Sequence, residues 1–205
     1  MKIGVYVGSF NPVHKGHIEV ARHLIKENIV DKVLMLPTPN YWDKQDLIGI
    51  DKRVEMLKLC EEENIKVDTV HNNHPFTYEV LESLKEDYKD DELYLIIGAD
   101  NLEKFYLWKN FDEIMKNKVI VLPRDGIDIE SLLSKYDKTR FVIANGFSEI
   151  NVSSTEIREN KDSSYLDEKV RKYIEENNLY GKWYYACYNS RRGKGWKNYI
   201  IFNAK

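Results

Sequence analysis

The chain has 205 residues, enough for one α/β domain with a small appendage, and its 42% hydrophobic and 32% charged residues are typical of soluble globular proteins. A formal net charge of −3 argues against a protein whose main partner is a nucleic acid or a membrane surface. The two cysteines form no metal-ligand spacing, and we recognise neither a signal peptide nor a run of eighteen apolar residues. We therefore expect a cytoplasmic protein with reduced thiols and no protein-bound metal site.

Apolar runs and helical spacings of apolar residues alternate along the chain. In chain order they predict a strand at 3–7, a helix at 18–25, a strand at 33–36, helices at 54–60 (capped by Asp51) and 80–88, a strand at 93–97, a helix at 111–115, strands at 119–122 and 141–144, and a helix at 170–174. Strands that alternate with helices predict an α/β fold with a doubly wound parallel sheet. Ligands of such sheets bind at the carboxyl ends of strands, where the polar segments 8–17, 37–44 and 98–101 fall.

The strongest motif is the glycine-bounded turn at residues 8–17, which reads Gly-Ser-Phe-Asn-Pro-Val-His-Lys-Gly-His. A helix that starts near Gly16 presents free N–H groups and a positive dipole end, which suit a phosphate. His14 and His17 are three residues apart, so a first helical turn places both rings on one side. They could be structural, they could bind a metal with a third ligand, or they could donate hydrogen bonds to phosphate oxygens during phosphoryl-group transfer.

A second motif lies at residues 152–158, which read Val-Ser-Ser-Thr-Glu-Ile-Arg. Ser153 and Glu156 have the spacing of a capping box, which a well-capped helix alone would explain. Arg158 lies one turn inside that helix start, so a second phosphate site with a guanidinium clamp is the alternative.

Together, the Gly-x-Phe-x-Pro-x-His-x-Gly-His stretch and the Ser-Ser-Thr-x-x-Arg stretch resemble the nucleotidylyltransferase superfamily, and within it the nicotinate-nucleotide adenylyltransferases of NAD biosynthesis. The resemblance spans about residues 1 to 181 and implies a Rossmann-like nucleotidylyltransferase fold. It also implies that AMP passes from ATP to the phosphate of nicotinate mononucleotide, with Mg²⁺ arriving on ATP. The expected partners are these two nucleotides, with a homo-oligomer left open and neither nucleic acid nor membrane involved.

The resemblance also assigns roles to individual residues. His14, His17, Lys44 and Arg158 would form the catalytic set that holds the phosphates. The remaining matched positions would line the nucleotide and pyridine pockets: Gly8, Ser9, Phe10, Gly16, Gly98, Asp100, Ser153, Ser154, Thr77 and Trp108.

This chain departs from the family pattern near the acceptor site. It has Tyr-Trp-Asp-Lys at 41–44 where the family commonly has Pro-Pro-His-Lys, and Pro-Phe-Thr at 75–77 where the family favours Ser-Tyr-Thr. Nicotinamide mononucleotide, pantetheine phosphate, FMN or a CTP-dependent acceptor therefore stay open as alternatives. A protein of another class, a nucleotide sensor without catalytic activity, is a further alternative. The presence of His14, His17 and Arg158 argues against it, because a sensor need not keep donors to the transition state.

Residues 183–205 differ from the nucleotidylyltransferase domain expected over 1–182. From Lys182 onward there are six Lys or Arg, no Asp or Glu, and many aromatic residues around Arg-Arg-Gly-Lys-Gly at 191–195. A hairpin that completes the fold, or a contact between subunits, is favoured over a site for single-stranded nucleic acid. A chain cut short inside a second domain would give the same pattern.

Overall fold

A computed structural model describes residues 1–39, 47–146 and 152–181. In these residues six parallel strands form one sheet in the order β3-β2-β1-β4-β5-β6. The strands are β1 (Lys2–Gly8), β2 (Lys32–Pro37), β3 (Ile65–Val67), β4 (Glu92–Gly98), β5 (Lys118–Leu122) and β6 (Phe141–Ile143). The predicted doubly wound parallel sheet is confirmed.

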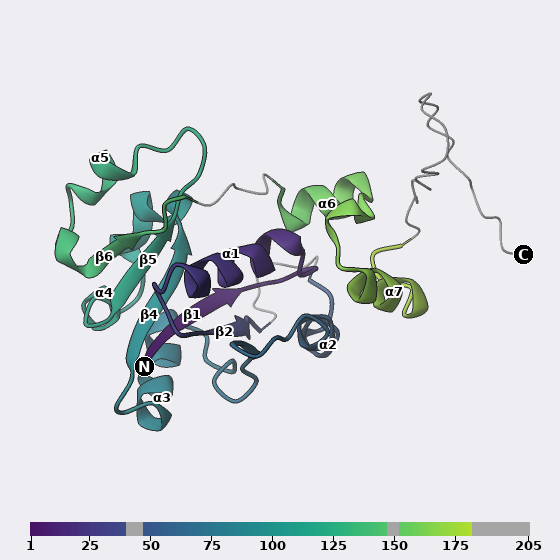
Figure 1. The fold of residues 1–205 in the computed structure, drawn as a ribbon, viewed down its shortest axis with the longest axis horizontal. Helices are drawn as coiled ribbons and strands as arrows, with labels where there is room; N and C mark the ends of the chain where they lie inside the picture. The colour runs from purple at the N-terminus through teal and green to yellow at the C-terminus, as the bar shows by residue number, and fades with distance from the viewer. Residues whose placement is uncertain (40–46, 147–151, 182–205) are drawn as a thin grey trace, which may run out of the picture.

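Helices cover both faces of this sheet because its strands bury side chains on both sides. The hydrophobic cluster on one face includes residues of α1 (Lys15–Lys26) and α2 (Ile50–Lys58) and continues to α6 (Ser154–Asn160) and α7 (Glu168–Glu176). The other face packs against α3 (Thr77–Asp87), the 3₁₀ helix η1 (Ala99–Leu107), α4 (Phe111–Ile114) and α5 (Ile129–Leu133). Two short 3₁₀ turns, η2 (Lys138–Arg140) and η3 (Ser163–Tyr165), complete the described elements. Figure 1 shows α6 and α7 at the opposite end of the molecule from α5 and β6.

The chain reverses its direction of travel across the sheet between β1 and β4. It runs from β1 outward to β2 and β3, then returns to place β4 on the other side of β1. Gly8 and Gly98 each lie two residues beyond the last ladder pair of these strands, Tyr6 with Ile96. This is the topological switch point, where doubly wound sheets bind their ligands.

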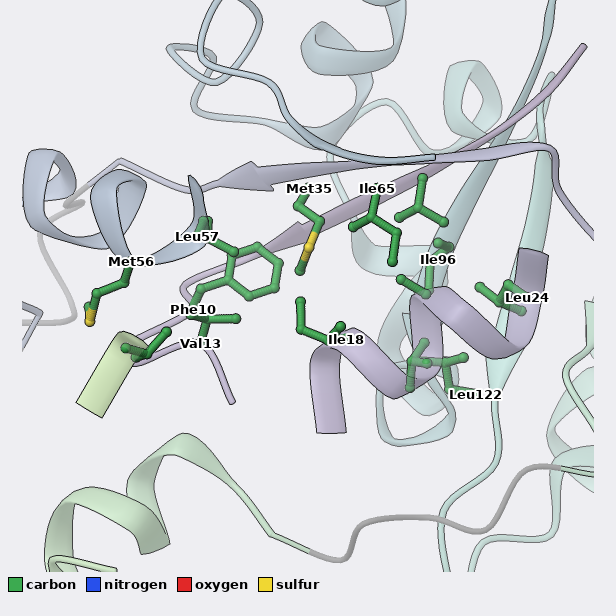
Figure 2. Packing of buried hydrophobic residues seen from close by; sticks show 14 of the residues in the cluster. Phe10, Val13, Ile18, Leu24, Met35, Met56, Leu57, Ile65, Ile96 and Leu122 are labelled. Atoms are coloured by element: carbon green, nitrogen blue, oxygen red, sulfur yellow. The ribbon is translucent and has the colours of Figure 1, made fainter. Parts of the chain in front are cut away.

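Buried apolar side chains anchor the loop that follows β1. Phe10 and Val13 are buried beside Met56 and Leu57 of α2, while Ile18 of α1 continues the same cluster (Figure 2). The loop after β1 is therefore anchored in the hydrophobic core, although it also carries the two motif histidines.

The predicted cap of one helix is wrong, and three elements were not predicted. Gly49, and not Asp51, is the N-cap of α2, because Asp51 lies inside the first turn of the helix. The N-cap of α3 is Phe76, and Thr77 is the first helical residue. The sequence pattern also missed β3, η1 and α5.

None of the helices in the described ranges is long and apolar enough to span a membrane. Cys60 is a half-buried free thiol whose pKa is raised to about 12, chiefly by burial. Cys187 and the predicted appendage at 183–205 lie outside the described residues.

Candidate active site

The turn between β1 and α1 packs tightly around Phe10. The Phe10 backbone is in the left-handed region (φ 45°), and its ring lies against Gly8, where an added Cβ would be 3.1 Å from the ring. The Phe10 ring also makes edge contacts with Tyr6 and His17, at centroid distances of 5.5 and 5.0 Å. A side chain at Gly8 would therefore fit only if the buried Phe10 ring shifted by a few tenths of an ångström.

The two motif histidines lie side by side at the start of α1, as predicted. His14 is the N-cap and His17 is the third helical residue, with ring centroids 3.8 Å apart. The His14 backbone N–H donates to Nδ1 of His17 at 3.2 Å. Since Nδ1 accepts this bond, the proton of the neutral His17 ring lies on Nε2, which is left as a donor.

Burial keeps both rings neutral. The pKa of His14 falls from 6.5 to about 4, first because of burial and second because of the positive charge of Arg124. The pKa of His17 falls well below 6.5 for the same reasons, with His14 adding to the effect. His14 is 6% exposed, and its Nδ1 has no hydrogen-bond partner among the described residues. Two neutral imidazoles at a helix start can therefore donate N–H groups to an anion and gain charge as it binds.

Arg124 follows β5 and adds positive charge at the same edge of the sheet. Its Nε lies 3.9 Å from Oδ1 of Asp100, and its charge acts on both histidines and on Tyr6. Asp100 itself is exposed beside Gly98, at the end of β4. The sequence around Arg124 does not reveal that its side chain lies near the histidines.

The second motif packs directly onto the first. Ser153 caps α6, and its reciprocal bond with Glu156 confirms the capping box. Ser154 donates from Oγ to the Pro12 carbonyl at 2.9 Å, and Arg158 donates from Nη1 to the Asn11 carbonyl. The helix start at α6 therefore holds the turn that carries the histidines.

A fully buried arginine supports the same turn from the other side. Arg53 donates to the carbonyls of Ser9 and Thr38 at 2.7 Å each, and to that of Ile48 at 3.1 Å. Burial lowers the pKa of its guanidinium. The loops that follow β1 and β2 are thereby joined, because one planar fork bonds the backbone of both.

The residues predicted for the pyridine pocket form a second group. Thr77 opens α3, and Trp108 follows η1 with its ring against Phe105 at 5.0 Å. Lys109 links these two segments, since its Nζ lies 3.8 Å from the centre of the Phe76 ring. Lys109 was not among the predicted site residues. Its place directly after Trp108, a residue assigned to the pyridine pocket, was the signal that could have identified it.

The structure thus brings together most of the predicted site residues at the carboxyl edge of the sheet. Around the turn after β1 these are Gly8, Ser9, Phe10, His14, Gly16, His17, Ser154 and Arg158, with Gly98 and Asp100 on the adjacent strand end. Lys44 lies outside the described residues, so the structure does not place it.

Comparisons with known proteins give the family. The cytidylyltransferase-like family profile matches residues 5–160. A probable nicotinate-nucleotide adenylyltransferase of Flavobacterium psychrophilum is 34% identical over 196 residues, 89% of this chain and 100% of the relative. The nicotinate-nucleotide adenylyltransferase of Bacillus subtilis is 33% identical over 192 residues, 87% of this chain and 98% of the relative.

A solved structure agrees with the fold. The Plasmodium falciparum nicotinic acid mononucleotide adenylyltransferase complexed with NaAD is 23% identical, and the match covers 87% of this chain and 97% of that one with a TM-score of 0.72. The chain belongs to the cytidylyltransferase-like family and, within it, to the nicotinate-nucleotide adenylyltransferases.

Proposed function

We propose that the protein transfers AMP from ATP to the phosphate of nicotinate mononucleotide, giving nicotinate adenine dinucleotide and pyrophosphate. The observation that carries this proposal is the neutral histidine pair at the start of α1, beside the β1–β4 switch point. Family membership supplies the acceptor, and the geometry supplies donors where charge develops during phosphoryl-group transfer.

The reaction is a direct displacement at the α-phosphorus of ATP. A phosphate oxygen of the mononucleotide forms the new P–O bond, and the bond from the α-phosphorus to the bridging oxygen breaks as pyrophosphate leaves. The acceptor phosphate is already ionised near neutral pH, with a second pKa of about 6, so it needs no general base. Catalysis then depends on the positioning of the two nucleotides and on the stabilisation of negative charge that develops in the transition state.

His17 has the best placed donor for this step. Its Nε2–H would bond an oxygen of the transferred phosphate, while His14 and Arg124 add a second donor and a positive charge. Arg158 and Ser154 would contact the phosphates that leave as pyrophosphate, as would Lys44. Removal of one such donor costs about 3 kcal/mol of transition-state stabilisation, or about a hundredfold in rate.

Mg²⁺ fits this arrangement as an ion held by the phosphates of ATP. Within residues 1–39, 47–146 and 152–181, no group of three or more His, Cys, Asp or Glu could form a metal cage. Mg²⁺ is commonly held by substrate phosphates with few carboxylates, and it supplies charge neutralisation when bound.

The start of α3 favours an acid group on the pyridine ring over an amide. The Thr77 hydroxyl and the Thr77 and Tyr78 N–H groups lie at the start of an eleven-residue helix, and Lys109 lies over the neighbouring Phe76 ring. Glu79 is already bonded to the Phe76 N–H at 3.4 Å and the Tyr78 hydroxyl at 3.0 Å. A carboxylate can accept from all these donors, whereas an amide must also place an NH₂ group. Phe76, which stands where the family favours tyrosine, therefore still offers an aromatic face to the Lys109 cation.

Acceptor preference tests the proposal. The rate of pyrophosphate release is measured with ATP, Mg²⁺ and either nicotinate or nicotinamide mononucleotide. We expect kcat/KM to favour the acid by at least a hundredfold, because a site built on hydrogen bonds discriminates strongly. Thr77→Val and Lys109→Met should each reduce this preference, whereas Lys104→Met, an exposed lysine on η1, should not. Equal efficiencies for the two acceptors would refute the acid assignment.

A further inference from the structure

The last part of the described chain reaches back to the catalytic turn. Tyr180 follows α7, and its hydroxyl donates to Oδ1 of Asn11 at 2.7 Å. Asn11 lies between Gly8 and His14 and is 1% exposed. A bond between residues 169 apart in sequence thus ends inside the turn that carries the histidines.

Both ends of the Tyr180 residue are fixed. Its carbonyl accepts from Nζ of Lys161, the residue that ends α6, while its hydroxyl binds Asn11. The Tyr180 backbone is in the left-handed region (φ 59°), as is that of Lys161 (φ 52°). A left-handed backbone is unfavourable for a non-glycine residue, so surrounding contacts must hold it there.

The Tyr180 hydroxyl is suited to donate and not to titrate. Burial raises its pKa above the usual value of 10.0, although the positive charges of Arg158 and Arg53 oppose that rise. The phenol therefore stays protonated across the physiological range. Those two arginines also bond the backbone of the turn, at Asn11 and Ser9.

Of the side chains that hold the turn, Tyr180 differs in what it binds. Arg53, Ser154 and Arg158 all bond backbone carbonyls of residues 9–12, whereas Tyr180 bonds a side chain. Loss of the Tyr180 hydroxyl would remove one donor from the buried Asn11 side chain and favour a displaced turn, because losing a hydrogen bond to a buried polar atom is unfavourable. His14, three residues further on, would move with the turn.

We infer that Tyr180 is a positioning residue, which fixes the catalytic turn through Asn11 and so sets the place of His14 and His17. This inference rests on the proposed function, because it assigns Tyr180 to the same reaction. It also implies that residues 177–180, which follow α7, contribute to turnover by holding this bond.

The test compares Tyr180→Phe, which removes only the hydroxyl, with Tyr173→Phe. Tyr173 lies on α7 and packs against the same core, and its hydroxyl forms no hydrogen bond within the described part of the chain. With ATP, Mg²⁺ and nicotinate mononucleotide, we expect kcat of Tyr180→Phe to fall about tenfold while KM for both substrates stays within about twofold. Tyr173→Phe should keep kcat within about twofold of wild type.

A double-mutant comparison shows whether the effect passes through Asn11. If the bond transmits it, adding Tyr180→Phe to Asn11→Ala should lower kcat by less than twofold, because the two residues act as one unit. Ring-proton NMR signals of His14 and His17 should shift in Tyr180→Phe and not in Tyr173→Phe, a readout that needs no turnover. A kcat equal to that of the control, two effects that multiply, or unmoved histidine signals would each overturn the inference. Failure of the wild type with this acceptor would instead refute the proposed function.

Discussion

The double role of His17 gives the sharpest prediction. Its Nδ1 accepts from the His14 backbone N–H at 3.2 Å, which helps to cap α1, and its Nε2–H is the proposed phosphate donor. An asparagine places a polar atom near the Nδ1 position and nothing near Nε2, whereas a glutamine does the reverse. His17→Asn and His17→Gln therefore separate the structural role from the catalytic one.

The two variants should fail in opposite ways. For His17→Asn we expect kcat to fall about a hundredfold or more, the effect of losing one donor to the transition state, and the free energy of unfolding to change by less than about 1 kcal/mol. For His17→Gln we expect a loss of about 1 kcal/mol in stability with the capping bond, and a smaller loss of kcat.

Two assays give these quantities: pyrophosphate release at saturating ATP and nicotinate mononucleotide, and urea unfolding followed by circular dichroism. Lys26→Gln, an exposed change on the same helix, serves as the control for nonspecific damage. A folded His17→Asn protein with kcat near wild type would refute the assignment of Nε2–H as the catalytic donor. A reversed order of the two variants would do the same.

Two further predictions concern stability. Because burial lowers the pKa of His14 from 6.5 to about 4, the unfolded chain binds the proton first as the pH falls, so this group should remove about 3 kcal/mol of unfolding free energy between pH 6.5 and 4. Urea unfolding at several pH values gives the free energy of unfolding as a function of pH. This free energy should fall less between pH 6.5 and 4 for His14→Gln than for the wild type, and equal falls would contradict the assignment. Arg53→Lys should cost about 3 kcal/mol, because an ammonium cannot bond three separate carbonyls in the plane of the guanidinium, and a loss below about 1 kcal/mol would show that the fork is not needed.

Local sequence patterns predicted the parts of the fold that depend on local physics. The apolar runs at β1, β2, β4 and β5 are long enough to identify, and each ends at a glycine or next to a proline. The spacing of His14 and His17 correctly placed their rings side by side. The capping box at the start of α6 was also readable, because its two partners are three residues apart.

Elements that depend on distant partners were not readable. β3 has only three residues and exists because it pairs with β2, and η1 is a nine-residue 3₁₀ helix without the period of an α-helix. Asp51 is of a residue type that often caps helices, but it lies within the first turn of α2. Its Oδ1 would be 2.4 Å from a Cβ added at Gly49, the residue that caps the helix.

The contacts that hold the catalytic turn were equally hidden. Arg158 and Tyr180 reach Asn11 across 147 and 169 residues of sequence, and no local pattern records such a pairing. The family resemblance gave Arg158 a role in phosphate binding, whereas its bond in the structure is to the turn.

The central claim is adenylyl transfer to nicotinate mononucleotide, and the fate of a phosphorus label tests it most directly. The protein is incubated with this acceptor, Mg²⁺ and ATP labelled with ³²P at either the α- or the γ-phosphate, and the products are separated. We expect the α-label in nicotinate adenine dinucleotide and the γ-label in pyrophosphate, in equal amounts. Transfer of the γ-label to the acceptor, or release of α-labelled AMP without a dinucleotide, would contradict the account.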